Sequence, residues 1–125
     1  MSEFDGVIAI DAMGGDFGPS VTVPAAITAM KDYGIKVILV GEEKEIKEEL
    51  SKYPKEIAQY IKIIPSEGVV NEGESPVNAY RSKPKASIFV SAGLVKKGYA
   101  QGVVSMGSSG ATLAAASILF GTIEG

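Results

Sequence analysis

Four short apolar runs, separated by stretches rich in glycine, proline or charge, constrain the fold of this chain more than any other feature. They occupy residues 7–10, 36–41, 61–64 and 102–105. β-Branched residues dominate these runs, and a continuous apolar pattern is typical of strands that are buried on both faces. The chain is therefore expected to form a sheet that helices cover on both sides.

Helical segments are expected to follow these strands. The predicted helices span residues 20–33, 42–52, 87–97 and 111–120. A further helix is expected to start at Ser75-Pro76, where serine serves as N-cap and proline takes the first helical position. Gly34 is placed to end the first helix. Pro24 fits that helix only if its regular part begins nearby, with proline in the first turn.

The second predicted helix, residues 42–52, is strongly charged, with only two apolar residues, four positions apart. Glu43 with Lys47, and Glu48 with Lys52, are spaced for ion pairs along the helix, each contributing about 0.3 kcal/mol. We interpret this charge run as a solvated helix face.

Four strand–helix units in series predict an α/β fold with a mostly parallel sheet and helices on both faces. The length of 125 residues fits a single domain that spans residues 1–125. Hydrophobic residues make up 46% of the chain, which is enough to bury a real core. No repeat, low-complexity tract or linker interrupts the pattern.

Composition removes several classes of chemistry. The chain contains no Cys and no His, which excludes disulfides, thiolate or imidazole metal ligands and Ser–His pairs within it. Any chemistry must use carboxylates, Lys or Arg, hydroxyls and backbone dipoles. The formal net charge of −3 gives no indication of a basic surface for binding nucleic acid. No leader or membrane-spanning run is visible, so a cytoplasmic location is expected.

One of two glycine-rich loops lies between the last predicted strand and the last predicted helix. Ligands of parallel sheets bind beyond the carboxyl ends of the strands, where such loops lie. Gly107, Ser108, Ser109 and Gly110 offer backbone N–H groups, two hydroxyls and a helix N-terminus, which suit a phosphate or an oxyanion. A tight turn with a serine cap is the simpler interpretation of the same residues.

The other glycine-rich loop follows the first predicted strand. It contains Gly14 and Gly15, with Asp11 at the strand end and Asp16 within the turn. Either carboxylate can orient a cation, bind a metal or act as a base, and turn chemistry with its own backbone is the alternative. Neither loop has the G-x-G-x-x-G pattern, and G-x-x-x-x-G-K-[ST] is absent, so nucleotide binding is poorly supported.

A basic segment lies between these loops in the sequence. Arg81, Lys83 and Lys85 place three positive charges within five residues, and Pro84 predicts a loop there. Such a cluster can clamp a phosphate or meet an acidic protein partner, and a plain surface cluster is the alternative.

Together these segments resemble the bacterial phosphate acyltransferase family known as PlsX. Residues 8–19 carry the string IAIDAMGGD before Gly-Pro, which is similar to the family's N-terminal signature. Residues 37–41 fit its second strand, and residues 74–87 follow its acidic, Ser-Pro and basic segment. Residues 103–111 match its strand and Gly-Asn-Thr-Gly-Ala loop, with two serines in place of Asn-Thr.

The resemblance implies a Rossmann-like three-layer α/β/α fold, similar to isopropylmalate dehydrogenase and phosphotransacetylase. It implies acyl transfer from acyl-acyl carrier protein to inorganic phosphate, which gives acyl phosphate for phospholipid synthesis. No cofactor and no metal is implied. The implied partners are the acyl carrier protein and a second copy in a homodimer.

The resemblance covers the N-terminal part of longer family chains. We therefore expect the chain to oligomerise or to be one part of a larger enzyme, because a parallel sheet edge and apolar helix faces would be left exposed. Membrane contact is expected only through the C-terminal part of the longer members.

The resemblance also implies roles for particular residues. Asp16 is the candidate for orienting a cation or taking a proton, and Arg81 and Lys83 for balancing phosphate charge or meeting the acidic carrier. The residues implied to line the phosphate and thioester site are Gly14, Gly15, Gly107, Ser108, Ser109 and Gly110.

Two other functions are alternatives. One is a noncatalytic or partner-dependent subunit, similar to the acetyl-phosphate-forming subunit of glycine reductase component C. The other is a simple nucleotide-binding α/β module, which lacks the expected glycine fingerprint.

Overall fold

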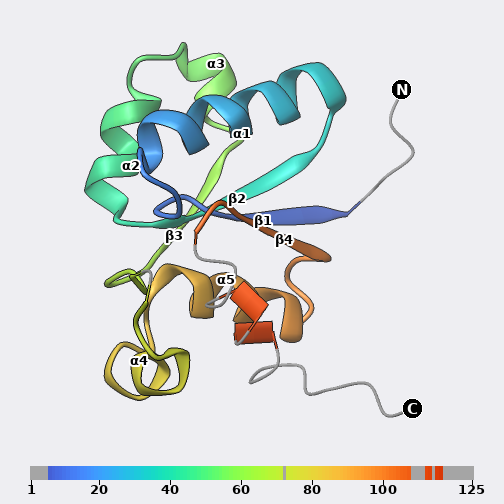
Figure 1. The fold of residues 1–125 in the computed structure, drawn as a ribbon. Coiled ribbons are helices and arrows are strands. Elements are labelled where there is room, and N and C mark those ends of the chain that lie inside the picture. Colours follow the sequence, from blue (N-terminus) through green and yellow to red (C-terminus); the bar gives the residue numbers. More distant parts are fainter. Residues whose placement is uncertain (1–5, 72, 108–111, 114, 117–125) are drawn as a thin grey trace.

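The computed structural model describes residues 6–71, 73–107, 112–113 and 115–116, and its centre is a four-stranded sheet (Figure 1). The strands are β1 (Val7–Asp11), β2 (Lys36–Gly41), β3 (Lys62–Pro65) and β4 (Gly102–Ser105). All of their pairings are parallel. The strands lie where the apolar runs predict them, with shifts of one residue at some ends.

The strand order is β3-β2-β1-β4, so β1 lies between the second strand and the last. In this register Asp11 is opposite Val40 on one side and Ser105 on the other. The chain runs outward from β1 to β3 and then returns to the far side of β1 for β4. The direction of winding therefore reverses between β1 and β4, the position where open α/β sheets bind their ligands.

Helices cover both faces of the sheet (Figure 1). One face carries α1 (Pro19–Tyr33), α2 (Glu43–Leu50) and α3 (Lys55–Ala58). On the other face α5 (Ser87–Lys96) packs under the strands, with α4 (Pro76–Ser82) beside it. This is the Rossmann-like three-layer arrangement that the sequence predicts.

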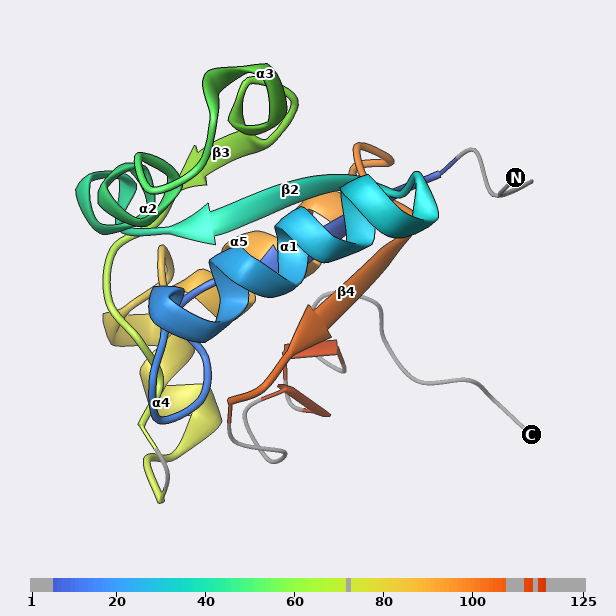
Figure 2. The same ribbon diagram turned by 90° about the horizontal axis from the view of Figure 1, so that it is seen from above.

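Each face has its own hydrophobic core. The core under α1 and α2 contains Ile10, Val23, Ala26, Ile27, Val37, Leu39, Ile46 and Leu50. The core around α5 contains Val70, Ala79, Ala86, Ile88, Phe89 and Ala92, and the ring of Tyr80 lies 4.9 Å from that of Phe89. The α1 layer does not extend over β4 (Figure 2), and Val104 on that strand is 50% exposed.

Helix α1 begins at Pro19, five residues before Pro24, so the expectation that Pro24 marks its first turn is wrong. Pro19 already supplies a fixed φ at the helix start, and Gly18 adopts the left-handed φ of 52° at the N-cap. Pro24 lacks the N–H that would donate to the carbonyl of Ser20, and Ser20 is an exposed residue of the helix. Gly34 ends the helix with φ 68°, as predicted.

Helix α2 ends at Leu50, two residues before the predicted end. Lys47 pairs with Glu43 at 2.6 Å, as its spacing predicts. Lys52 instead pairs with Glu49 at 3.0 Å, and the predicted partner Glu48 is wrong, because residues 51–52 form a turn that displaces this lysine from the helical spacing.

The short helix α3 was not predicted, because its four residues show no apolar periodicity and none of them is buried. It also explains why β3 begins at Lys62 and not at Ile61. The backbone N–H of Ile61 donates to the carbonyl of Ala58 at 3.1 Å, so Ile61 still belongs to the preceding turn.

The predicted helix over residues 111–120 falls mostly outside the described residues. Residues 112–113 and 115–116 are helical, and the rest of that segment lies beyond the description. Within the described ranges, no helix combines the length and the apolar character needed to cross a bilayer.

Candidate functional site

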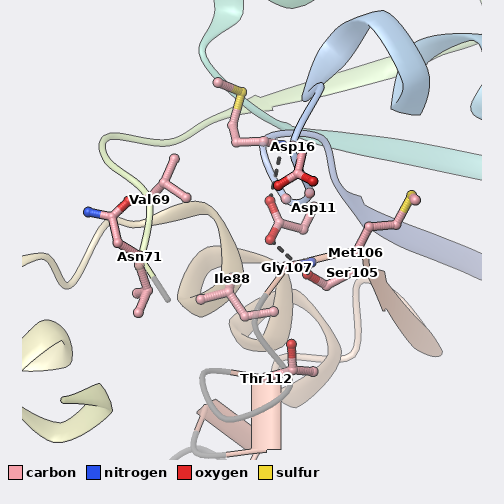
Figure 3. A pocket seen from close by; sticks show the side chains of 13 residues that line it. Asp11, Asp16, Val69, Asn71, Ile88, Ser105, Met106, Gly107 and Thr112 are labelled. Carbon is pink, nitrogen blue, oxygen red and sulfur yellow. Dashed lines mark hydrogen bonds between the residues drawn. The ribbon is translucent and has the colours of Figure 1, made fainter. Parts of the chain in front are cut away.

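A cavity of about 350 Å³ opens at the carboxyl ends of β1 and β4 (Figure 3). Three stretches of the chain line most of it: residues 13–16 after β1, residues 69–71 after β3, and residues 105–107 at the end of β4. Asp11, Ile88 and Thr112 complete the lining. The glycine-rich loop after β1 therefore meets Gly107, the first residue of the second glycine-rich loop, at the point where the winding of the sheet reverses.

Asp11 connects the two loops from a buried position, with 3% of its surface exposed. One carboxylate oxygen, Oδ1, accepts from the backbone N–H of Met13 at 3.1 Å. The other, Oδ2, accepts from the hydroxyl of Ser105 at 3.0 Å, and Ser105 Oγ in turn accepts from the N–H of Gly107 at 3.1 Å (Figure 3). Asp11 thus fixes the turn after β1 and the end of β4 relative to each other.

Gly14 is the position where the two loops come closest. A Cβ atom there would lie 2.9 Å from the Gly107 nitrogen, 3.0 Å from Ser105 Oγ and 3.1 Å from Asp11 Oδ2. Gly15 adopts φ 84°, and a Cβ on it would lie 3.2 Å from the Cβ of Met106. Both positions therefore require glycine, one for space and one for both conformation and space.

Asp16 lines the cavity from an exposed position. In Figure 3 its side chain lies on the same side of the cavity as Asp11. Across the part of the chain that the structure describes, Asp16 forms no ion pair, and the N–H groups of Gly15 and Asp16 donate to no protein acceptor. An anion bound in the cavity can therefore accept from these two N–H groups.

The basic segment lies outside the cavity lining. Arg81 is exposed on α4, while Lys83 is half-buried and occupied by two protein acceptors. Lys83 Nζ donates to the carbonyl of Val69 and to Glu74 Oε1, each at 3.1 Å. Lys83 is therefore connected to the cavity indirectly: it donates to the carbonyl of Val69, and Val69 lines the cavity.

Glu74 is held in its charged form by this arrangement. The backbone N–H of Asn71, and then the hydrogen bond from Lys83, lower the pKa of Glu74 below its ordinary value. The Asn71 N–H to Glu74 Oε1 distance is 3.1 Å, and the N–H of Glu74 donates back to the Asn71 carbonyl at 3.1 Å. The loop after β3 is thus closed into a compact turn.

Of the predicted site residues, the structure brings Gly14, Gly15, Asp16 and Gly107 together around one cavity. Arg81 and Lys83 lie on or just after α4, away from its lining. Ser108, Ser109 and Gly110 lie outside the described residues. The described residues contain no group of three or more acidic side chains placed to hold a metal ion.

Two parts of the site carry little sequence signal. Ser105 is a single serine at a strand end, and its importance comes from its register opposite Asp11. The wall formed by residues 69–71 lies in a loop with mainly polar neighbours, where the apolar pair Val69-Val70 was the only available indication.

A four-stranded parallel sheet with helices on both faces and a cavity at the switch point defines a Rossmann-like α/β protein, and such a cavity is where ligands of this fold class bind. Comparison with known proteins identifies the family. Residues 7–125 match the family described as Fatty acid synthesis protein, and the chain belongs to that family.

Relatives named "Phosphate acyltransferase" occur in several bacteria. The protein of Nitratidesulfovibrio vulgaris (strain DP4) is 42% identical over 119 residues, which cover 95% of this chain and 34% of the relative. The protein of Picosynechococcus sp. is 43% identical over 125 residues, covering 100% and 34%, and that of Clostridium botulinum (strain Langeland) is 43% identical over 120 residues, covering 95% and 36%. The chain thus spans about a third of the length of these relatives.

Proposed function

We propose that this chain carries the phosphate and thioester site of a phosphate acyltransferase that forms acyl phosphate from acyl-acyl carrier protein and inorganic phosphate. The observation that carries the proposal is the cavity between the two glycine-rich loops, in a chain whose relatives bear the name phosphate acyltransferase. The product, an acyl phosphate, is an activated acyl donor for phospholipid synthesis.

The proposed reaction is a direct displacement. A phosphate oxygen attacks the thioester carbonyl carbon, the C–O bond forms, and the tetrahedral intermediate collapses as the C–S bond breaks. The proton of hydrogen phosphate ends on the thiol of the released carrier. Because this chain contains neither Cys nor His, it supplies no covalent nucleophile of that kind, and its contribution is positioning and preorganised dipoles.

The cavity offers donors for the negative charge on phosphate and on the tetrahedral intermediate, and a carboxylate that can move the proton. The N–H groups of Gly15 and Asp16 would donate to a phosphate oxygen or to the oxyanion of the intermediate. Asp16 would take the proton from phosphate and pass it to the leaving sulfur, since its carboxylate lines the cavity and has no ion-pair partner among the described residues. Arg81, exposed on α4 outside the lining, would meet the acidic carrier protein.

Trapping of acyl phosphate with hydroxylamine tests the proposal. With this chain, acyl-acyl carrier protein and phosphate, we expect a hydroxamate signal that disappears when phosphate is omitted. Asp16→Asn should lower kcat by about 10²- to 10⁴-fold if the carboxylate moves a proton. Asp32→Asn, which removes an exposed carboxylate at the far end of α1, is the matched control and should leave kcat unchanged. An active Asp16→Asn variant would rule out the assigned proton transfer.

A second candidate function is a partner-dependent subunit of the same enzyme. It is favoured by the charge of the cavity, whose described lining contains two carboxylates and no Lys or Arg to balance a phosphate. In that case the chain alone gives no hydroxamate. Addition of a separate chain that carries the remaining two-thirds of a relative would restore the signal by supplying the cation.

A further inference from the structure

The loop after β3 supplies one whole wall of the cavity through Val69, Val70 and Asn71. The sheet holds only the start of this loop, since β3 ends at Pro65 and is an edge strand that is hydrogen-bonded to β2. Three backbone hydrogen bonds hold the start of the loop: the N–H of Ser66 donates to Gly41 O at the end of β2, that of Glu67 to Lys85 O, and that of Ser87 to Gly68 O. Beyond Gly68 the side chain of Val70 is buried in the core around α5, and the backbone on either side of it needs a further connection.

The side chain of Lys83 makes that connection. Its ammonium group donates to Val69 O and to Glu74 Oε1, and the same Glu74 oxygen accepts from the N–H of Asn71. One lysine therefore joins the two ends of the wall, residues 69 and 71, to the C-terminus of α4. Its aliphatic part packs over Gly68, where a Cβ would lie 3.7 Å from Lys83 Cδ.

The ammonium group is committed to these contacts and is only partly open to water. The Lys83 side chain is 34% exposed and that of Glu74 is 26% exposed. A lysine that served phosphate directly would have to leave both acceptors, and Val69 O and Glu74 would then lose a charged donor.

We propose that Lys83 is a positioning residue, which with Glu74 forms a latch that holds the wall of residues 69–71 against the cavity. The kinetic part of this proposal rests on the proposed phosphate acyltransferase function, while the structural part does not. Catalysis that depends on positioning is sensitive to wall displacement, because a misplacement of about 1 Å can cost about 10²-fold in rate.

The test combines kinetics with hydrogen–deuterium exchange. Lys83→Met should lower kcat about 10- to 100-fold while the KM for phosphate changes less than about twofold. Glu74→Ala should cause a comparable loss, and the double variant should be no worse than Lys83→Met, because both changes open one latch. Lys83→Arg keeps two donors and should recover most of the rate.

The matched control is Lys97→Met, which removes the charge of an exposed lysine at the far end of α5 and should change neither kcat nor KM. If Lys83 binds phosphate directly, Lys83→Met would raise the KM for phosphate, and Glu74→Ala would not share its effect. That result would contradict the proposed positioning role of Lys83.

Hydrogen–deuterium exchange tests the structural part of the proposal and does not require the chain to be enzymatically active. Amides of residues 66–75 should exchange faster in Lys83→Met and Glu74→Ala than in the unchanged chain, while amides of β1 and β2 keep their rates. Unchanged exchange in this loop would overturn the proposal. If the unchanged chain forms no acyl phosphate, the proposed function fails by itself, and exchange still tests the latch. If Lys83→Met folds poorly, Glu74→Gln, which keeps the shape of the side chain, replaces it in the comparison of exchange rates with the unchanged chain.

Discussion

The two walls of the cavity are held in different ways. The wall made by the glycine-rich loops rests on the sheet: Asp11 and Ser105 are register partners on adjacent strands, and the loops approach until Gly14 leaves no room for a Cβ. The wall of residues 69–71 rests on side chains: Val70 is buried in the core around α5, and the partly exposed Lys83–Glu74 pair holds the backbone of residues 69 and 71. A site can therefore combine a wall fixed by backbone packing with one that side-chain contacts position.

The largest expected effect comes from filling the closest approach. Gly14→Ala places a methyl group 2.9 Å from the Gly107 nitrogen, so the backbone of one loop must move. We expect a loss of about 2–3 kcal/mol in the free energy of unfolding, as for overpacked sites, and loss of acyl transfer. Urea denaturation measures the first and hydroxylamine trapping the second.

The control for that substitution is Gly93→Ala in α5, where a Cβ meets nothing within 4 Å. Its helical position favours alanine, so its stability should be unchanged or slightly higher. A Gly14→Ala variant as stable as Gly93→Ala would show that the loops separate easily. The contrast between the two walls would then disappear.

A smaller effect is expected when the buried acceptor between the loops is removed. Asp11→Ala leaves the N–H of Met13 and the hydroxyl of Ser105 without their acceptor, which should cost about 2 kcal/mol of unfolding free energy. Asp11→Asn keeps one acceptor oxygen and should lose less. Urea denaturation of both variants beside Ser105→Ala checks this order, and equal stability of all three would contradict it.

The smallest effect concerns the ion pair of the other wall and depends on pH. The folded-state pKa of Glu74 is lowered, so its contribution to stability is present above the ordinary carboxyl pKa of 4.5 and is lost as pH falls through the lower folded value. The stability difference between the unchanged chain and Glu74→Gln should therefore be positive at pH 7 and vanish in acid.

The comparison for this pair is Glu43 with Lys47 on α2, which at 2.6 Å is a shorter but more exposed pair than Lys83 with Glu74 at 3.1 Å. Replacing Glu43 by Gln should cost about 0.3 kcal/mol at neutral pH. It should also leave exchange of residues 66–75 unchanged, whereas Glu74→Gln speeds it. If Glu74→Gln, like Glu43→Gln, left the exchange of residues 66–75 unchanged, the Lys83–Glu74 pair would not position this loop.

The sheet was predictable from sequence because its strands are apolar runs bounded by glycine and proline, and Ser75 was predictable as a cap. Its side chain accepts from the N–H of Asn78 at 3.5 Å. The meeting of Gly14 with Gly107 followed only from the general rule that loops gather at the carboxyl ends of parallel strands. Their actual distance depends on strand order, which periodicity does not encode.

The remaining features depend on tertiary structure. Pro24 lies inside α1, beyond its first turn, and the pairing of Lys52 with Glu49 depends on where α2 ends. The acceptors of Lys83 lie 9 and 14 residues away in the sequence, so spacing alone indicates a cation and not its partners. A lysine that the sequence predicts to bind a ligand can thus be hydrogen-bonded to acceptors of the protein itself.

The hydrogen bond from Ser105 to Asp11 joins residues 94 positions apart. Closing so long a loop is slow compared with pairing β1 and β2, which are separated only by α1 and its turns. The first three strands can therefore assemble while the far side of β1 is still unoccupied, and the cavity comes into being only when β4 docks. During synthesis β4 emerges after the other three described strands, so the cavity forms only after those strands are available.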